Sequence, residues 1–451
     1  MYITEKFADF VENLSYEDLP KNIIDLAKQR IMDTLGASIA GGANWDYTEQ
    51  LKEACRHMGT GNFHTVGDTK NEFPAARCAM INATFAHAIE LDDGHRNAGC
   101  HAGAVVVPTA LALGWELKKS GKEIITAVVA GYEVVYRIAS HVNPFQINKG
   151  FHPSSNCDTY GAAAVAGKLL GLNKEQLANA MGQAGMFSSG TMEATKNGQR
   201  AKCVQVGNAA FNGILAAYCA QSGMEGCKSA LEGGHGLFNT QSENVDVEDV
   251  TRGLGESYLI GDTYSKLYPC CRHAQPGIEA VLDLTAEHQL TPDQVKEIHI
   301  GTHKVAYELT GHIKEPHNSG EAKFSLAYGS ALALYEHSFG VDHLKEKFYT
   351  NPDILSLSNK VECHLDPAVQ AKFPKQRGAK VDIELKDGTV YSKELYFLKA
   401  SPENPVGWDV LEEKFRNCAS ATIPAGTVKQ IVDFLAHLEQ QDSVESLMNL
   451  V

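Results

Sequence analysis

The sequence predicts a mainly α-helical protein, with a large all-helical domain formed by both chain ends and a smaller α+β domain inserted into it. Apolar residues recur at steps of three and four through the first 260 residues, which is the period of an α-helix. After about residue 265, alternating apolar and polar stretches flank a tight-turn sequence, and helical periodicity returns near the end of the chain. We therefore assign residues 1–265 and 401–451 to the helical domain and residues 266–400 to the α+β domain.

The helical part shows its period clearly where Ile23, Ala27, Ile31 and Leu35 follow one another on one face. Several later segments are rich in alanine and glycine, such as residues 161–167. Small residues let helix axes approach closely, so we expect these segments to be inner helices of a packed bundle. The further predicted helices span residues 75–91, 105–118, 123–140, 160–170, 174–184 and 206–221.

The inserted part contains a helix-capping pattern. Thr291 is followed by Pro292 and, three residues after the cap, by Gln294, which predicts a short helix at this point. Later, Asp387-Gly388 between two alternating segments is a strong hairpin signal. The remaining predicted elements are strands at 296–302, 380–385 and 390–395, a helix at 322–335, and, after a Pro- and Gly-containing stretch at 402–407, helices at 408–416 and 427–438.

Composition and charge exclude several classes of protein. The chain has 40 Lys and Arg against 55 Asp and Glu, a net charge of −15, and no apolar run near the roughly 18 residues of a membrane span. A surface of this charge repels nucleic acid and anionic lipid, so we expect neither as a partner. The eleven cysteines lack zinc-finger or CxxC spacing, and the first residues do not resemble a signal peptide, so we expect a soluble cytoplasmic protein with reduced thiols.

A run of titratable residues, HAIELDDGH, occupies residues 87–95 at the end of an apolar segment. Adjacent carboxylates raise one another's pKa, so such a run is costly to order without a function. Two other interpretations stay open. One is a solvated helix end. The other is a metal site, although the paired-histidine spacing typical of such sites is missing, and its candidate ligands would be Asp92, Asp93, His95 and His101.

A second polar segment, KGFHPSS at residues 149–155, precedes the alanine-rich helix. Ser154 and Ser155 supply hydroxyl groups, and the N-terminus of the following helix supplies backbone N–H groups. This combination suits binding of a carboxylate. His152 alone is a weak signal, because a histidine in such a place is about as often structural.

Two short basic clusters, at residues 196–202 and 266–273, contain no acidic residue. Cations placed together repel one another unless an anion compensates them, so both clusters are candidate sites for a small polyanion. The alternative is a pair of solvated loops. No phosphate-binding glycine loop occurs, which makes carboxylate the better candidate ligand. The cationic residues are Lys196, Arg200 and Lys202 in the first cluster and Lys266, Arg272 and His273 in the second.

Tyr328 is a further candidate, on the apolar predicted helix that follows Glu321. A buried tyrosine with one satisfied hydroxyl group is the ordinary interpretation of this pattern. A role in proton transfer depends on tertiary context.

The order of these segments resembles the MmgE/PrpD family over nearly the whole chain. That family includes 2-methylcitrate dehydratase, cis-aconitate decarboxylase and iminodisuccinate epimerase. The resemblance implies a helical domain from both chain ends, a lid-like α+β domain, a homodimer, and catalysis without a metal or an organic cofactor. The segments that carry it are HAIELDD (87–93), GFHPSS (150–155), GAAAVAGKLLGL (161–172), AKCVQVGNAA (201–210), KLYPCCRH (266–273) and KFSLAYGSALAL (323–334).

The resemblance also implies which residues line the pocket. The family often has His-Pro where this chain has His101-Ala102-Gly103, and the loop 94–100 is individual too; this loop shapes the pocket. The candidate substrate-binding residues are Asn97, Ser154, Ser155, Lys196, Arg200, Arg272 and His273. The family's pocket positions fall on Asp93, His101, His152, Lys202, Lys266 and Tyr328, which are the candidate catalytic residues.

Family substrates carry two or three carboxylates and react at a carbon next to one of them. Such chemistry needs a proton donor or acceptor, here His101 or His152 with Asp93 orienting one of them, and cations that hold the carboxylates, here Lys202 and Lys266. Tyr328 could donate a proton or a hydrogen bond.

We expect a dehydratase-type lyase whose substrate is a small polycarboxylate, with decarboxylation and epimerisation as alternatives. A non-catalytic helical scaffold and a metal-dependent hydrolase are alternatives of other classes. On the preferred interpretation, Lys202→Ala and Lys266→Ala weaken substrate binding and turnover and leave the fold intact.

Overall fold

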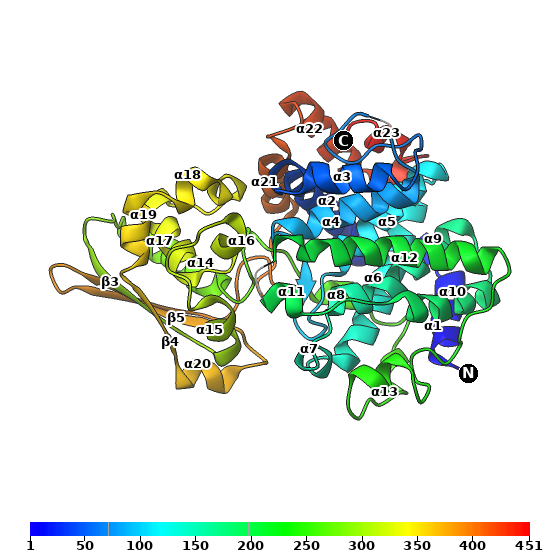
Figure 1. Ribbon diagram of the computed structural model, residues 1–451, viewed down its shortest axis with the longest axis horizontal. Helices are drawn as coiled ribbons and strands as arrows, with labels where there is room; N and C mark the ends of the chain where they lie inside the picture. The colour runs from blue at the N-terminus through cyan, green and yellow to red at the C-terminus, as the bar shows by residue number, and fades with distance from the viewer. Residues whose placement is uncertain (71, 197–198) are drawn as a thin grey trace. The chain divides into compact units, whose positions relative to one another are not determined.

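The computed structural model describes residues 1–70, 72–196 and 199–451. As the sequence predicts, the protein is mainly helical, and the described residues contain one four-stranded and one two-stranded sheet (Figure 1). The chain divides into two compact units. Unit 1 comprises Met1–Ala88, Asp92–Ser265 and Gly407–Val451, and unit 2 comprises Ile89–Leu91 and Lys266–Val406.

The core of unit 1 is a bundle of closely packed helices. Its inner members are α2 (Lys21–Asn44), α4 (Ala75–Ala88), α5 (Ala102–Glu116), α6 (Gly121–Val142), α9 (Asp158–Leu170) and α12 (Val204–Gln221). Helix α12 packs against α9 and α4, and α4 packs against α5 and α2. A Cβ atom added to Gly213 of α12 would lie 2.3 Å from the Cβ of Ala162 in α9, so this close approach needs glycine. The expected role of small residues in the inner helices is confirmed.

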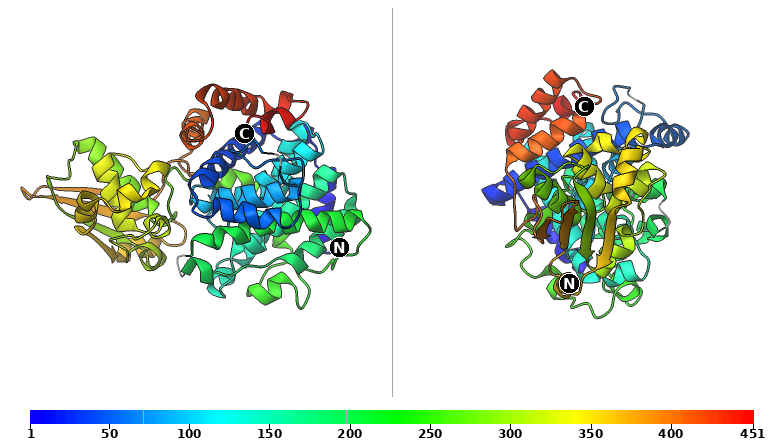
Figure 2. Two further views of the ribbon diagram at one scale, coloured as in Figure 1. Left: turned by 45° about the horizontal axis from the view of Figure 1, so that its top comes forward. Right: turned by 90° about the vertical axis from the view of Figure 1, so that its left-hand side faces the viewer.

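Both ends of the chain contribute to unit 1. Figure 2 shows the C-terminal helices beside the N-terminal ones, and α21 (Trp408–Ala419) and α22 (Ala425–Ala436) pack on α2. The strands β1 (Gly94–His95) and β2 (Thr263–Tyr264) pair antiparallel. The other helices of this unit are α1 (Ile3–Asn13), α3 (Thr48–Arg56), α7 (Phe145–Asn148), α8 (Pro153–Asn156), α10 (Lys174–Phe187), α11 (Glu193–Lys196), α13 (Leu237–Gln241) and α23 (Glu445–Met448).

Unit 2 contains the four-stranded sheet, in the order β4-β3-β5-β6. Strand β3 (Val295–Thr302) pairs parallel with β4 (Val361–Leu365) and antiparallel with β5 (Ala379–Leu385), and β5 forms the predicted hairpin with β6 (Val390–Leu395). Gly388 in its turn has φ +89, a value that favours glycine. Helix α14 (Gln275–His288) packs on β5 and β6. The other helices are α15 (Lys304–Thr310), α16 (Ser319–Lys323), α17 (Leu326–Glu336), α18 (Glu346–Tyr349), α19 (Pro352–Ser358) and α20 (Pro367–Lys372).

Two predicted elements of this unit differ from the structure. The capping pattern at Thr291 forms only a turn, because strand β3 begins at Val295 and leaves no room for a helix. The predicted helix 322–335 is interrupted between α16 and α17, where the Ser325 side chain accepts a hydrogen bond from the Tyr328 backbone N–H and starts a new helix.

Two further observations concern the chain as a whole. None of the eleven cysteines takes part in a disulfide. Among the described residues, no helix has both the length and the apolar character needed to cross a membrane.

Candidate active site

One cluster of titratable side chains lies at the C-terminal end of α4, within unit 1. His87, in the last turn of α4, places its Nδ1 atom 2.6 Å from the Asp92 carboxylate. Its Nε2 atom lies 3.2 Å from the Lys202 ammonium group. The side chains of His87 and Asp92 are almost fully buried, with exposed fractions of 1% and 0%. A carboxylate, an imidazole and an ammonium group therefore form a continuous chain.

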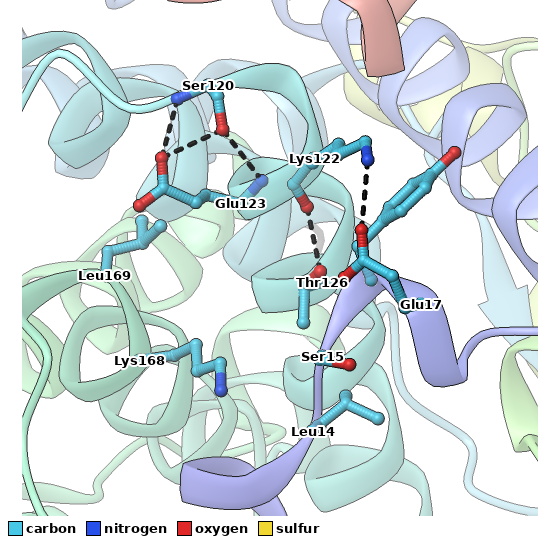
Figure 3. A pocket seen from close by; sticks show the side chains of 10 residues that line it. Leu14, Ser15, Glu17, Ser120, Lys122, Glu123, Thr126, Lys168 and Leu169 are labelled. Atoms are coloured by element: carbon cyan, nitrogen blue, oxygen red, sulfur yellow. Dashed lines mark hydrogen bonds and ion pairs between the residues drawn. The ribbon is translucent and has the colours of Figure 1, made fainter.

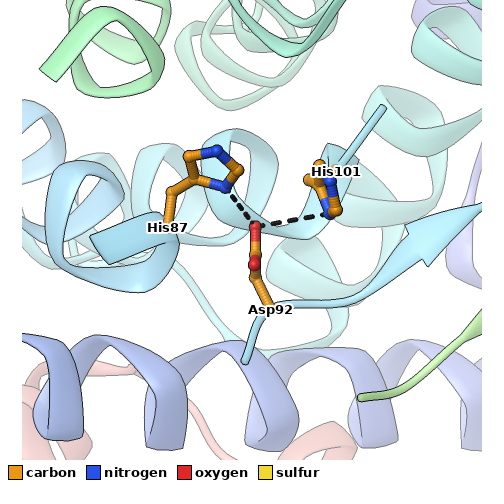
Figure 4. Close-up of side chains that lie close together, drawn as sticks. All are labelled: His87, Asp92 and His101. Carbon is orange, nitrogen blue, oxygen red and sulfur yellow. Dashed lines mark hydrogen bonds and ion pairs between the residues drawn. The ribbon is translucent and has the colours of Figure 1, made fainter. Parts of the chain in front are cut away.

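His101 joins the same cluster from the N-terminus of α5, which begins at the next residue. Its Nδ1 atom lies 2.5 Å from the Asp93 backbone carbonyl and 3.5 Å from an Asp92 carboxylate oxygen (Figure 4). A carbonyl oxygen only accepts hydrogen bonds, so Nδ1 is the donor and in the neutral ring Nε2 holds the lone pair. The His101 backbone N–H donates to the Ser154 hydroxyl oxygen at 2.8 Å. With 19% of its side chain exposed, His101 is open to a ligand.

His152, in the segment that also contains Ser154 and Ser155, lies on the cluster as well. The His152 ring is 94% buried, and its centre lies 5.8 Å from that of His87, whose centre lies 5.1 Å from that of His101. The His152 carbonyl accepts a hydrogen bond from the Ser155 hydroxyl at 3.0 Å. Gly190 packs against Ser155 so closely that a Cβ atom would overlap with its hydroxyl oxygen. The segment at 149–155 thus places the His152 ring beside His87 and the Ser154 hydroxyl at the His101 backbone N–H.

Asp93 is fully buried behind His101. Its carboxylate accepts hydrogen bonds from the Gly103 backbone N–H at 3.1 Å and from the Tyr132 hydroxyl at 2.5 Å. Burial raises the pKa of Asp93 to about 6, against the opposing charge of Arg30. A Cβ atom at Gly103 would lie 2.7 Å from the Asp93 carboxylate and 2.6 Å from the Tyr132 hydroxyl, which explains the glycine of the unusual 101–103 segment.

This raised pKa predicts a pH-dependent effect of Asp93→Asn on stability. The folded-state pKa lies above the ordinary value of 3.8, so the folded protein binds the Asp93 proton more tightly than the unfolded chain does. The resulting stabilisation is complete below pH 3.8 and is lost as the pH rises through about 6. The amide imitates the protonated carboxyl group, so the variant should match the wild type near pH 4. Above pH 7, the free energy of unfolding of the variant should exceed that of the wild type by about 3 kcal/mol. Chemical unfolding from pH 4 to pH 8 tests this, with the exposed Asp293→Asn as control; a difference that stays constant with pH contradicts it.

The cluster also contains donors that could hold a metal ion. Ligand atoms of His87, Asp92 and His101 lie within 4.8 Å of one another. A metal-binding imidazole nitrogen must offer a lone pair. The two Nδ1 atoms instead point at oxygen acceptors at 2.6 and 2.5 Å, so both carry a proton in this arrangement. We therefore treat the group as a hydrogen-bonded cluster. Two other candidate ligands from the sequence lie outside this group: the Asp93 carboxylate accepts the Tyr132 hydroxyl, and His95 accepts the Ala98 backbone N–H with its Nδ1 atom.

Of the first basic cluster, Lys202 reaches the histidines. Arg200 forms an ion pair with Asp46 at 2.5 Å and donates to the Tyr47 hydroxyl at 3.0 Å, so an acidic residue distant in sequence compensates its charge. Lys196 is exposed at the end of α11, and Asn197 and Gly198 lie outside the described residues. Asn97 is also exposed. The substrate-binding roles of Lys196, Arg200 and Asn97 stay predictions.

The remaining candidate residues belong to unit 2. Lys266 has no exposed surface and pairs with the Glu90 carboxylate at 3.2 Å. Arg272 donates to the Gln275 side-chain oxygen and the Ser401 hydroxyl, each at 2.8 Å. Each of these two cations therefore has defined partners inside unit 2.

His273, which is half-buried, and Tyr328, which is fully buried, belong to unit 2 as well. The Nδ1 atom of His273 lies 3.4 Å from the Nε2 atom of His303, and burial together with the Arg377 charge holds the His273 pKa well below its ordinary value. The Tyr328 hydroxyl donates to the His343 carbonyl at 3.1 Å, and burial raises its pKa. This geometry agrees with the interpretation of Tyr328 as a buried tyrosine with a satisfied hydroxyl, and its catalytic role stays a prediction.

The sequence did not single out His87 and Glu90 as site residues, and it gave Asp92 only as a candidate metal ligand, although all three lie in the HAIELDD segment. The signal that could have found His87 and Asp92 is the end of the helix between them. Helix α4 ends at Ala88, so the chain turns back and brings residue 92 to the ring of residue 87.

A separate cavity of unit 1 contains none of the predicted site residues. Its lining includes Leu14, Lys122 and Lys168 (Figure 3). Lys122 pairs with Glu17 at 3.0 Å, and the Glu123 carboxylate accepts the Ser120 backbone N–H at 2.9 Å. Its charged groups therefore have partners of their own, and the cavity does not add to the cluster around His87.

Comparisons with protein families and with individual known proteins point to the same family. The MmgE/PrpD N-terminal domain matches residues 5–249, and the MmgE/PrpD C-terminal domain matches residues 268–440. Cis-aconitate decarboxylase of Aspergillus terreus is 26% identical, over 100% of this chain and 96% of that protein. Cis-aconitate decarboxylase of Homo sapiens is 29% identical, over 100% and 94%. The mitochondrial 2-methylcitrate dehydratase of Yarrowia lipolytica is 27% identical, over 60% and 54%.

Proposed function

The chain belongs to the MmgE/PrpD family of lyases, and we propose that it removes CO2 from a small unsaturated tricarboxylic acid of the cis-aconitate class. The observation that carries this proposal is the cluster in unit 1. It places the rings of His87, His101 and His152 side by side, with His87 in contact with both the buried Asp92 carboxylate and the Lys202 ammonium group. Such a set can bind a carboxylate and move a proton at a neighbouring carbon.

The comparisons support placing decarboxylation before dehydration. The decarboxylase relatives align with the whole chain, whereas the Yarrowia lipolytica dehydratase aligns with 60% of it. This reverses the order that the motifs alone suggested. Dehydration of a hydroxy-tricarboxylic acid is the second candidate, because the dehydratase relatives share the same family segments.

The proposed reaction assigns a separate task to each group. The Lys202 ammonium group pairs with a carboxylate of the substrate. His101, protonated on both nitrogens, donates its Nε2 proton to the alkene carbon next to a carboxylate. The electron pair of the breaking carbon–carboxylate bond forms the shifted double bond, and CO2 leaves. Asp92, 3.5 Å from His101 Nδ1, favours the charged ring before this transfer.

His152 is the second proton-transfer candidate. In the dehydration alternative one histidine takes the proton next to a carboxylate and the other donates a proton to the departing hydroxyl group. The rings of His101 and His152 both lie next to that of His87, at centre distances of 5.1 and 5.8 Å, so the cluster contains two histidines for these two tasks.

A panel of di- and tricarboxylic acids in D2O, followed by NMR, tests the proposal. With cis-aconitate we expect loss of CO2 and one deuterium in each product molecule. Formation of an alkene from citrate or methylcitrate identifies a dehydratase instead, and deuterium exchange without change of connectivity identifies an epimerase. If no acid of the panel changes, the proposed function is wrong.

A further inference from the structure

In the hydrogen-bonded chain Asp92–His87–Lys202, a lysine that binds a carboxylate is accompanied by two buried side chains. Lysine alone could bind a carboxylate without His87 and Asp92. His87 is 1% exposed and Asp92 is 0% exposed, so both were taken out of water to make these contacts. We propose that His87 is a positioning residue, which Asp92 fixes in one tautomer and which holds the Lys202 ammonium group in place. The inference rests on the proposed function in that it takes Lys202 as the group that binds the substrate carboxylate.

The hydrogen-bond partners determine the tautomer of His87. Asp92 faces two ring N–H groups, that of His87 at 2.6 Å and that of His101 at 3.5 Å, as an ionised carboxylate does. The proton of neutral His87 therefore sits on Nδ1, and its Nε2 atom offers a lone pair to Lys202 at 3.2 Å. The opposite tautomer would direct an N–H group at the ammonium group, and two donors cannot share a hydrogen bond.

The surroundings of His87 keep its ring in this orientation. The rings of His101 and His152 pack at centre distances of 5.1 and 5.8 Å, with interplanar angles of 55° and 77°. In this partly buried place, a hydrogen bond between an ammonium group and a lone pair is stronger than in water. His87 thus presents a fixed acceptor to a flexible cation.

A fixed acceptor matters because lysine is a long side chain. Ordering it costs up to about 2 kcal/mol of rotamer entropy, and Lys202 extends from the short turn Arg200–Cys203. The contact with His87 orders the Lys202 side chain before substrate binds, so this entropy is not lost again on binding. One ammonium hydrogen points at His87, and on this proposal the contact fixes the position of the ammonium group that binds the substrate carboxylate.

A double-mutant cycle tests whether His87 acts through Lys202. His87→Asn keeps a polar group near Asp92 and removes the acceptor that faces Lys202, whereas His87→Gln can place its side-chain oxygen near the former Nε2 position. We expect His87→Asn to lower kcat/KM for cis-aconitate roughly 10- to 100-fold, and His87→Gln to restore most of this loss. In a Lys202→Met background, His87→Asn should change kcat/KM by less than about twofold.

Two outcomes of the cycle overturn the inference. One is an equal loss from His87→Asn with and without Lys202, which would mean that His87 acts independently. The other is a loss in His87→Gln as large as that in His87→Asn. Thermal unfolding of each variant accompanies the kinetics, so that a folding defect is distinguished from a loss of positioning.

A measurement without substrate separates this inference from the proposed function. NMR of [15N]histidine-labelled protein reports the tautomer of each ring, and the signal missing in His87→Gln identifies His87 among the 18 histidines. We expect a proton on Nδ1 alone in the wild type. A proton on Nε2, alone or together with Nδ1, overturns the inference. This result is decisive even if the wild type turns over no acid of the panel, which would refute only the proposed function.

Discussion

Replacing His101 with alanine is expected to lower kcat for cis-aconitate by about 10²- to 10⁴-fold, the usual contribution of a positioned general acid or base. The expectation follows from the geometry of the ring. Its Nδ1 atom is bound to the Asp93 carbonyl at 2.5 Å, so Nε2 is the atom that can exchange a proton with substrate. The backbone N–H bond to Ser154 is independent of the side chain, so the loop should keep its place.

Steady-state kinetics and deuterium incorporation measure this effect. The matched control is His437→Ala, which removes an exposed histidine near the C-terminal end of the sequence. This variant should keep the wild-type kcat. A His101→Ala variant that retains more than about a tenth of wild-type kcat would exclude His101 as the proton donor. His152 would then be the remaining candidate in the cluster.

Replacing Lys266 with methionine is expected to destabilise unit 2 by about 3 to 5 kcal/mol, because it removes one partner of a buried ion pair. The Lys266 side chain is 0% exposed and that of Glu90 is 5% exposed, at a distance of 3.2 Å. The variant leaves the Glu90 charge buried without this cation. The structure therefore changes the expectation from sequence that Lys266→Ala leaves the fold intact.

Thermal unfolding provides the measurement, with an expected fall of the midpoint on the order of 10 °C. Lys296→Met is the matched control, because it breaks an ion pair of 2.7 Å in the same unit whose lysine is 52% exposed, and it should leave the midpoint nearly unchanged. Adding Glu90→Gln to Lys266→Met should restore part of the loss. Equal midpoints for Lys266→Met and Lys296→Met would contradict this account.

Periodicity and turn chemistry were sufficient for most of the secondary structure. The helices of the bundle and the hairpin at Asp387-Gly388 follow from local patterns, because their buried faces repeat at a fixed step. Strand β4 was missed, since only the first of its five residues is buried and no alternation marks it. The turn at Thr291 shows that a capping pattern cannot act where the next strand starts at once.

The sequence was sufficient to find the segments that form the candidate site. It was not sufficient to find which side chains contact one another. Arg200 looked uncompensated because no acid is near it in sequence, yet Asp46 pairs with it across 154 positions. Lys202 is separated from His87 by 115 positions, so no spacing rule connects them. Such contacts depend on how helices pack, and a local pattern contains no information about that.

On the proposed function, the cluster around His87 moves a proton next to a carboxylate. The most direct test is a time course of wild type and His101→Ala with carboxyl-13C-labelled cis-aconitate in D2O, followed by NMR. The account predicts that the wild type releases labelled CO2 and incorporates one deuterium per product molecule, while His101→Ala does so at least 100-fold more slowly. Equal rates of CO2 release by the two proteins, or unchanged cis-aconitate with the wild type, would contradict it.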